Sequence, residues 1–593
     1  MKTINFLFLL LVATQVLAQP NEIANVYNRK ITPLNGVWTW NLAPETGYKI
    51  PQNDPKSNQS NAKNLAGKLN IPAAWNGISN FLFSYESGVT FSKSFDYTLP
   101  EGKRLFLYFG ASNYLTNTKF NAYDHTAHRG GFTPFNIEIS RKVKTKNNLL
   151  QVTVSNKRRA DEVPALMYDW LNYGGITNDV LLVELPETFI QNYHIQLGKN
   201  NPGSIVGWLR LKGDAASQKV TIEIPEAGIK EKMKTNEDGF VTFNFRAKGI
   251  ESWSPENPKL YKVIIRSETD VLEDKIGFRT IEAIKNKLVL NGKNILLRGI
   301  GYMDELSLTA SRMQTAEDFK KLIQQVKDLN CNFLRVMNCP ANELLVRLAD
   351  EAGIMIQEEI PVYGNIKFED DYTQEIAGKQ LKDLIERDRN RASVIIWSIG
   401  NETAVGEKRN EIMNDLLNLA HKLDVSRLVT AGIRTTESPN VLNTKIIDDP
   451  IGELCDVITV SDFTGWLKNE KMGYAGIPYD CKKVKWEAKY DKPHLFADMG
   501  AGANYGTHGD TTKRWSEELQ EALVKNQIEM VERLPSFAGL SLCPLYDFRT
   551  MMNKGIFFRQ GYNRRGLLSE KGEKKKGYLF LKAYYEKQAK KKS

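Results

Sequence analysis

The stretch Val394-Ile395-Ile396-Trp397-Ser398-Ile399-Gly400-Asn401-Glu402 is an apolar run of strand length that ends in a carboxylate. Three earlier runs resemble it, at Ile295-Leu296-Leu297, Cys331 to Val336 and Ile354-Met355-Ile356. Apolar residues at helical spacing separate these runs, so strands and helices alternate after Asn291. Repeated units of this kind over about 280 residues predict a (β/α)₈ barrel, which usually needs about 250.

Local signals support the predicted helices between these strands. Thr315 is a plausible N-cap, and Asp318 lies in the first turn, where a negative charge is favourable. Gly353 can end the next helix, because glycine accepts the left-handed conformation that often terminates helices.

A second carboxylate is expected opposite Glu402. In such barrels catalytic groups lie at the C-terminal ends of the strands. The short apolar run Pro493-His494-Leu495-Phe496-Ala497 leads into Asp498, and 498 − 402 is 96 residues. Three strand–helix units of about 31 residues span about 94 residues, so Glu402 and Asp498 are predicted to end strands four and seven. Two carboxylates flanking one bond are what glycosidic cleavage requires.

The first half of the chain has the alternation of half-buried strands. Leu150, Val152 and Val154 alternate with polar residues, and so do Val220, Ile222 and Ile224. We therefore predict β-structure for residues 19–187 and a small β-sandwich for residues 188–280, followed by the barrel and a basic C-terminal tail over residues 281–593.

The positive charge of the chain is local. The sequence of 593 residues has a net charge of +10, and residues 551–593 alone hold 13 Lys or Arg and 3 Asp or Glu, which is 13 − 3 = +10. Nucleic-acid binding requires basic residues spread along a face, so it is not expected. We interpret the stretches Lys574–Lys576 and Lys590–Lys592 as a solvated helix and a frayed end.

Residues 1–18 have the basic, apolar and small-residue order of a secretory signal peptide. We therefore expect a secreted or periplasmic protein without a membrane-spanning segment. The five cysteines are too few to predict a disulfide framework, although one bridge is possible. No spacing of metal ligands is present, so we expect neither a metal nor another cofactor.

Several motifs together give the sequence a recognisable family. Arg387-Asp388-Arg389-Asn390 through Trp397-Ser398-Ile399-Gly400-Asn401-Glu402 resembles the acid/base motif of glycoside hydrolase family 2, the β-galactosidases and β-glucuronidases. Further matches, in the family's order, are Gly130–Phe135, Asp169–Ile176, Trp253–Pro255, Gly277–Arg279, Tyr546–Arg549 and Asn563–Gly566. The resemblance implies a divergent member with an N-terminal jelly-roll sugar-binding domain, an immunoglobulin-like β-sandwich and a C-terminal TIM barrel.

The resemblance also implies roles for individual residues. Glu402 would be the general acid/base, Asn401 would contact a sugar hydroxyl, and Asp498 stands where the family has its Glu nucleophile. The other candidate sugar-binding residues are Arg335, Asn338, Asp169, Glu305, Trp466, Asn563 and Arg565. Asp169 is alternatively a loop acid of the sandwich, and Trp466 a packing residue. Arg565 could bind a sugar carboxylate through a bidentate pair, or belong only to the basic tail.

The main departure from the family is Asp498, which is one methylene shorter than Glu and reaches about 1.5 Å less far. Three outcomes stay open. The backbone could advance and keep a retaining separation of about 5–5.5 Å, the gap could widen to about 6.5–9.5 Å and make Asp498 the base of an inverting enzyme, or the site could be inert. Met303 and Asn338 replace histidines of the family, and Cys543 replaces an aromatic residue.

The predicted function is that of an exo-acting β-glycosidase, retaining by default. It would remove a terminal β-linked sugar, such as a galactoside or glucuronide, from polysaccharide-derived oligosaccharides. The alternative is a catalytically impaired, carbohydrate-binding relative. The sequence leaves the oligomeric state open, a homo-oligomer included.

Overall fold

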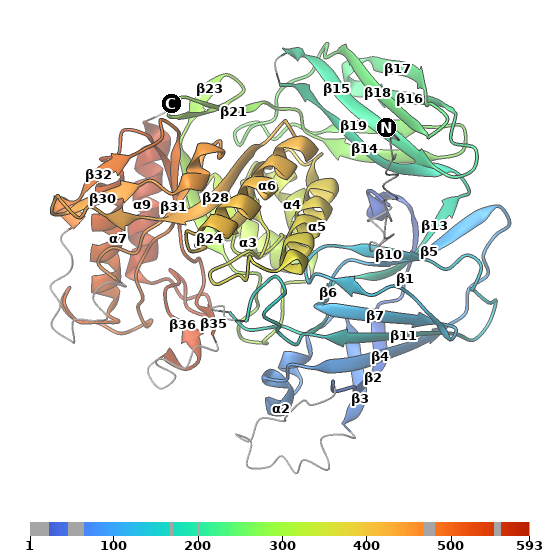
Figure 1. Cartoon of the computed structure of the whole chain (residues 1–593), viewed down its shortest axis with the longest axis horizontal. Coiled ribbons are helices and arrows are strands. Elements are labelled where there is room, and N and C mark those ends of the chain that lie inside the picture. Colours follow the sequence, from blue (N-terminus) through green and yellow to red (C-terminus); the bar gives the residue numbers. More distant parts are fainter. Residues whose placement is uncertain are drawn as a thin grey trace, which may run out of the picture.

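The computed structural model describes residues 23–45, 65–166, 170–199, 201–466, 481–550 and 559–591. Two β-sandwiches lie beside a closed, eight-stranded parallel barrel (Figure 1). This confirms the predicted fold class of β-domains followed by a TIM barrel. The predicted signal peptide, residues 1–18, lies outside the described residues.

The first sandwich packs a four-stranded sheet against a larger one. Leu150, Val152 and Val154 are fully buried between the sheets, as their alternation predicted. The first sheet has the order β1 (Lys30–Pro33), β13 (Val180–Pro186), β5 (Lys103–Phe109) and β10 (Phe135–Glu138). The second has the order β3 (Ala66–Ile71), β2 (Gly36–Leu42), β4 (Gly88–Phe95), β11 (Asn148–Ser155), β7 (Leu115–Phe120) and β8 (Tyr123–Asp124), and β9 (His128–Arg129) also pairs with β7.

The second sandwich is smaller and also consists of two antiparallel sheets. Val220, Ile222 and Ile224 point into its core, where each is at most 1% exposed. Its sheets are β14 (Phe189–Gly198), β15 (Asn201–Lys212) and β18 (Phe240–Arg246), and β17 (Ile229–Lys234), β16 (Lys219–Ile224), β19 (Tyr261–Arg266) and β20 (Val271–Ile276).

Buried polar contacts fix this second sandwich to the barrel. Asn390 donates from its amide nitrogen to the carbonyl of Tyr193 at 3.0 Å, and Arg391 forms a buried ion pair with Asp274. Trp253 is fully buried and donates through Nε1 to the carbonyl of Asp350 at 2.8 Å. Residues close to the acid/base motif therefore also hold two domains together.

The barrel brings the carboxyl ends of its strands to one mouth. Its strands, in order around the barrel, are β24 (Leu297–Tyr302), β25 (Phe333–Val336), β26 (Met355–Glu359), β27 (Val394–Asn401), β28 (Leu428–Arg434), β31 (Ile458–Ser461), β33 (His494–Asp498) and β34 (Phe537–Leu542). Glu402 thus follows the fourth strand and Asp498 ends the seventh, as their spacing predicted.

The helices follow the predicted pattern at their ends. Thr315 caps the helix α3 (Ala316–Asp328) in a reciprocal capping box with Asp318, and Gly353 ends α4 (Glu343–Ala352) with a φ of 73°. The remaining described helices are the short α2 (Asn80–Phe83), and α5 (Asp371–Asp388), α6 (Glu407–Leu423), α7 (Glu517–Val531) and α9 (Lys576–Lys590). No helix in the described ranges is long and apolar enough to cross a membrane.

Short strands form further small sheets outside the barrel ring and outside the main sheets of the two sandwiches. They are β6 (Ser112–Asn113) with β12 (Gly175–Ile176), β21 (Ile281–Ile284) with β22 (Lys287–Leu290) and β23 (Lys293–Ile295), β29 (Thr436–Glu437) with β30 (Thr444–Ile447) and β32 (Lys485–Ala488), and β35 (Phe548–Arg549) with β36 (Tyr562–Asn563).

The basic C-terminal stretch differs in one respect from the prediction. Lys575 is fully buried and not solvated, and its ammonium lies 2.8 Å from Asp547 Oδ1. A buried charge requires an opposite partner, and Asp547 also pairs with Arg564 at 3.1 Å. This cluster anchors the start of α9 beneath the loop that carries Asn563 and Arg565.

Candidate active site

Glu402 reaches the mouth of the barrel through an irregular strand end. The strand β27 is buried along its whole length, and its pairing with β28 is interrupted between Ser398 and Asn401. Glu402 itself has a φ of 55°, and its N–H donates to the carbonyl of Gly432 at 2.9 Å. A non-glycine residue in this conformation costs on the order of 1–3 kcal/mol, so packing on β28 must hold it there.

Asp498 lies deep in the mouth with both carboxylate oxygens engaged. Oδ1 is 2.9 Å from Arg335 Nη1, and Oδ2 accepts a hydrogen bond from Asn401 Nδ2 at 2.8 Å. Burial alone would raise the pKa of Asp498. The charge of Arg335 and the hydrogen bonds from Arg335 and Asn401 outweigh burial and hold the pKa below its usual value. Asp498 is therefore held as a carboxylate.

A third carboxylate lies behind this pair. Arg335 is fully buried and also contacts Glu359, the last residue of β26, at 3.1 Å. Glu359 Oε1 accepts a hydrogen bond from the backbone N–H of Asn338 at 2.9 Å. Burial raises the pKa of Glu359, although Arg335 opposes the rise. Arg335 thus positions Asp498 from inside the barrel.

Glu402 has different partners, which come from the fifth and sixth strands. Arg434 Nη2 lies 2.9 Å from Glu402 Oε2, and the hydroxyl of Ser461 donates to Oε1. The side chain of Arg434 is 64% exposed, whereas that of Glu402 is 11% exposed. The partner of Glu402 can therefore move into solvent, which the partner of Asp498 cannot do.

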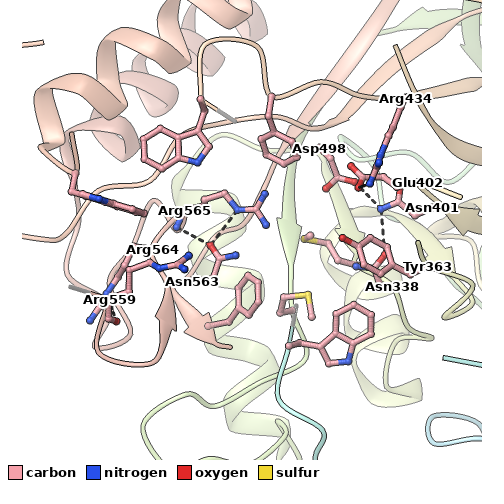
Figure 2. Close-up of a pocket in the computed structure, with 17 residues that line it drawn as sticks. Asn338, Tyr363, Asn401, Glu402, Arg434, Asp498, Arg559, Asn563, Arg564 and Arg565 are labelled. Carbon is pink, nitrogen blue, oxygen red and sulfur yellow. Dashed lines mark hydrogen bonds and ion pairs between the residues drawn. The ribbon is translucent and has the colours of Figure 1, made fainter. Parts of the chain in front are cut away.

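Both carboxylates line one cavity of about 290 Å³ at the mouth. Figure 2 shows Glu402, Asp498 and Asn401 on one side of it and Asn563 and Arg565 on the other. A volume near 300 Å³ is at the lower end of the range for small-molecule sites, so the cavity fits one sugar. Its further lining residues are Trp170, Met303, Met337, Asn338, Tyr363, Arg434, Phe463, Trp466, Trp515, Phe548, Arg559 and Arg564.

The wall opposite the carboxylates is basic and rigidly held. Arg565 donates through Nε to Asn563 Oδ1 at 3.2 Å, and its guanidinium lies 4.6 Å from the centre of the Phe463 ring. Arg565 also contributes to lowering the pKa of Asp498. Arg564 is paired with Asp547, and both Arg564 and Arg565 line the cavity.

The sequence-predicted residues are distributed as follows. The cavity is lined by seven of them: Glu402, Asp498, Asn401, Asn338, Trp466, Asn563 and Arg565. Trp466 is buried and packs edge-to-face on Trp515, with ring centres 5.0 Å apart. Asp169 lies outside the described residues.

Two predicted sugar-binding residues do not line this cavity. Arg335 contacts Asp498 and Glu359 from behind, as described above. Glu305 lines a side cavity of about 20 Å³, where it accepts a hydrogen bond from the backbone N–H of Arg549 at 2.6 Å. Burial raises the pKa of Glu305 to about 7, against the hydrogen bonds that Ser307 and Arg549 donate to it.

Sequence reasoning missed Glu359, Arg434, Tyr363 and Arg559. Glu359 and Arg434 both end barrel strands, so the rule that identified Asp498 would have identified them once the strands were placed. Arg559 has a helical assignment directly after the undescribed residues 551–558, and no motif in the sequence marked it.

No group of three or more His, Cys, Asp or Glu side chains in the described ranges could hold a metal ion. All five cysteines are described and buried, and none forms a disulfide.

Comparisons with known proteins show the family of the chain. The family model "Glycosyl hydrolases family 2, TIM barrel domain" matches residues 281–588, and the model "Glycosyl hydrolases family 2" matches residues 188–279. The β-glucuronidase of Paenibacillus borealis is 24% identical over 597 residues, which cover 90% of this chain and 94% of that protein.

Solved structures show the same fold. The β-D-glucuronidase of Dictyoglomus thermophilum has a TM-score of 0.78 at 23% identity, over 94% of this chain and 97% of that one. The family 2 β-galacturonidase of Eisenbergiella tayi, bound to galacturonate, has a TM-score of 0.79 at 21% identity, over the same shares of the two chains.

Proposed function

The chain belongs to glycoside hydrolase family 2, and we propose that it is an exo-acting β-glycosidase that removes a terminal β-linked uronic acid from polysaccharide-derived oligosaccharides. Relatives named β-glucuronidase and a structural neighbour named β-galacturonidase support an acidic terminal sugar. Because residues 1–18 have the residue order of a signal peptide, we also propose that the enzyme is secreted or periplasmic.

The position of Arg565 opposite Glu402 and Asp498 carries this proposal (Figure 2). A guanidinium binds a carboxylate through two parallel hydrogen bonds, and its planar shape matches a uronate better than a neutral hydroxymethyl group. Phe463 beneath Arg565 and the amide of Asn563 beside it fix the guanidinium before the ligand binds. Such preorganisation lowers the cost of ordering the side chain on binding.

The two carboxylates would act in the order usual for a retaining mechanism. Asp498 attacks the anomeric carbon while Glu402 gives its proton to the glycosidic oxygen, and the leaving sugar departs as an alcohol. Glu402 then removes a proton from water, which attacks the anomeric carbon and releases Asp498. The low pKa of Asp498 supports the nucleophile's role, because the attacking group must be ionised.

A panel of 4-nitrophenyl β-glycosides tests the proposal. We expect the wild type to hydrolyse the glucuronide or galacturonide at least tenfold better than the galactoside and glucoside. Glu402→Gln should lose roughly 10²–10⁴-fold on substrates that need acid assistance. Glu407→Gln, an exposed acid at the start of α6, is the matched control and should keep full activity.

Two further outcomes decide between alternatives. Hydrolysis of no glycoside, together with measurable oligosaccharide binding, would favour the impaired binding relative. Proton NMR of the first-formed sugar reports stereochemistry: we expect the β-anomer, and an initial α-anomer would make Asp498 the base of an inverting enzyme.

A further inference from the structure

A second cavity adjoins the first at Glu402. It measures about 260 Å³ and is lined by Glu402, Arg434, Thr435, Lys445, Ser461, Asp462, Phe463 and Thr464. It shares Glu402, Arg434 and Phe463 with the first cavity but does not include Asp498. The sugar under attack must contact Asp498, so it occupies the first cavity. The second cavity borders Glu402 but not Asp498, which is where a leaving group is expected.

Distances place Arg434 close to the bond that breaks. A general acid must come within about 2.6–3.2 Å of the oxygen that it protonates. Arg434 Nη2 is 2.9 Å from Glu402 Oε2, so the guanidinium lies within about 6 Å of the glycosidic oxygen. A charged group on the sugar beyond that oxygen is therefore within reach of Arg434.

The charge balance of the acid step indicates which group this is. While Glu402 is ionised, it neutralises Arg434. Before Glu402 can act as an acid it must carry a proton, and it then no longer neutralises Arg434. Asp498, the other carboxylate that acts on Arg434, is already paired with Arg335. The other cation of the second cavity, Lys445, is buried in an ion pair with Asp462, so it does not compete for a ligand anion. An anion supplied by the substrate would restore the balance at Arg434.

We propose that the second cavity is the leaving-group subsite and that Arg434 selects substrates with an acidic group on the sugar next to the scissile bond. This inference deepens the proposed function, on which it rests, by adding an acidic residue on the leaving side to the terminal uronic acid. The exposed side chain of Arg434 exchanges Glu402 for the substrate anion.

Paired aryl uronides test the role of Arg434. The two probes are the 3-carboxyphenyl and 3-carbamoylphenyl β-glycosides of whichever uronic acid the wild type releases, since they are nearly isosteric and differ in charge. The quantity to compare is the ratio of kcat/KM for the carboxyphenyl glycoside to kcat/KM for the carbamoylphenyl glycoside. We expect this ratio to be about tenfold higher in the wild type than in Arg434→Met, as for a charged hydrogen bond at a partly exposed site. Arg434→Lys should give an intermediate ratio, because lysine keeps the positive charge but cannot form the two parallel hydrogen bonds of a guanidinium.

A charge at the same mouth but away from Glu402 provides the control. Lys408 lies on α6 and pairs with Glu411 at 3.1 Å, so Lys408→Met should leave the ratio unchanged. If Arg434→Met changes both substrates by the same factor, the inference is overturned and Arg434 only holds Glu402. If the wild type releases neither aryl alcohol, the proposed function fails and takes this inference with it.

Equilibrium binding gives a readout that does not depend on turnover. Glu402→Gln imitates the proton-carrying acid, so Arg434 lacks its counter-charge in this variant. The thioglycosides of the same two aryl groups resist hydrolysis and can be titrated by calorimetry. We expect Glu402→Gln to bind the carboxyphenyl compound about tenfold more tightly than the carbamoyl compound, and the double variant Glu402→Gln with Arg434→Met to bind both equally. Equal binding by the single variant would contradict the proposal.

Discussion

Asp498 and Glu402 line the same cavity, but the protein surrounds them differently. Asp498 lies between Arg335 and Asn401 on buried strands, and the side chain of Arg335 is fully inaccessible. Glu402 pairs with Arg434, whose side chain is 64% exposed. In the proposed mechanism, the group that attacks as an anion has a fixed partner, and the group that gives and takes a proton has a partner that can leave. The two ion pairs should therefore respond very differently to mutation.

The largest effect is expected from removing the charge of Asp498 itself. Asp498→Asn should lower kcat by roughly 10⁴-fold or more on the best aryl glycoside, as when other enzymes lose a nucleophile. Steady-state kinetics measures this loss. Asp462→Asn, an acid at the neighbouring strand end that pairs with Lys445, serves as a comparison, and an equal loss in both variants would remove the special role of Asp498.

The next effect is a loss of folding stability, which should be larger for the buried ion pairs of Arg335 than for the exposed ion pair of Arg434. Arg335→Met leaves the carboxylates of Asp498 and Glu359 buried without their cation, and such a loss typically costs about 3–5 kcal/mol. Arg434→Met removes an exposed partner and should cost about 1 kcal/mol or less. Denaturant unfolding of both variants measures the difference. Similar losses of stability would mean that the two environments are not as distinct as we infer.

A steric change can break the contact between Asn401 and Asp498. A Cβ at position 432 would come within 2.0 Å of Asn401 Oδ1, so Gly432→Ala must displace the amide that donates to Asp498. A displacement of about 1 Å can cost about a hundredfold, which we expect in kcat. Gly406→Ala is the control, because a Cβ there meets nothing within 4 Å, and it should behave as the wild type.

The smallest effect concerns pH. Asp498 attacks as an anion, and its pKa lies below the usual 3.8, so kcat/KM should not fall on account of Asp498 until the pH is below about 4. Asn401→Ala removes one hydrogen bond that lowers this pKa, so the acid limb should move to higher pH. Asn338 contacts Asn401 but not Asp498, so Asn338→Ala should move the acid limb less. An unchanged limb in Asn401→Ala would show that Asn401 does not set this pKa.

The lowered pKa of Asp498 also contributes to the stability of the folded protein, and the sign of this contribution is defined. A carboxyl whose pKa is lower in the folded state stabilises the protein above the unfolded pKa, and this contribution is lost as the pH falls through the folded pKa. Because the pKa of Asp498 is lowered, its share of stability should persist at pH 5 and disappear only in strong acid.

Much of the barrel was predictable from local pattern. The runs before Glu402 and Asp498 are buried strands, and the 96 residues between them correspond to three strand–helix units. The identities of Asn401, Asn563 and Arg565 as pocket residues followed from the family resemblance. The burial of Lys575 was not predictable, because a run of three lysines gives no sign that one of them meets Asp547 across the fold.

The sequence by itself determined the alternation of strands and helices, the family and the two carboxylates, because periodicity and short motifs are local properties of the chain. Only the tertiary structure decided which charges meet. Arg335 joins Glu359 to Asp498, and Arg434 joins Glu402, across separations of 24 to 163 residues along the chain. Pairing at such separations depends on how the strand ends converge at the mouth, and that convergence exists only once the barrel has closed.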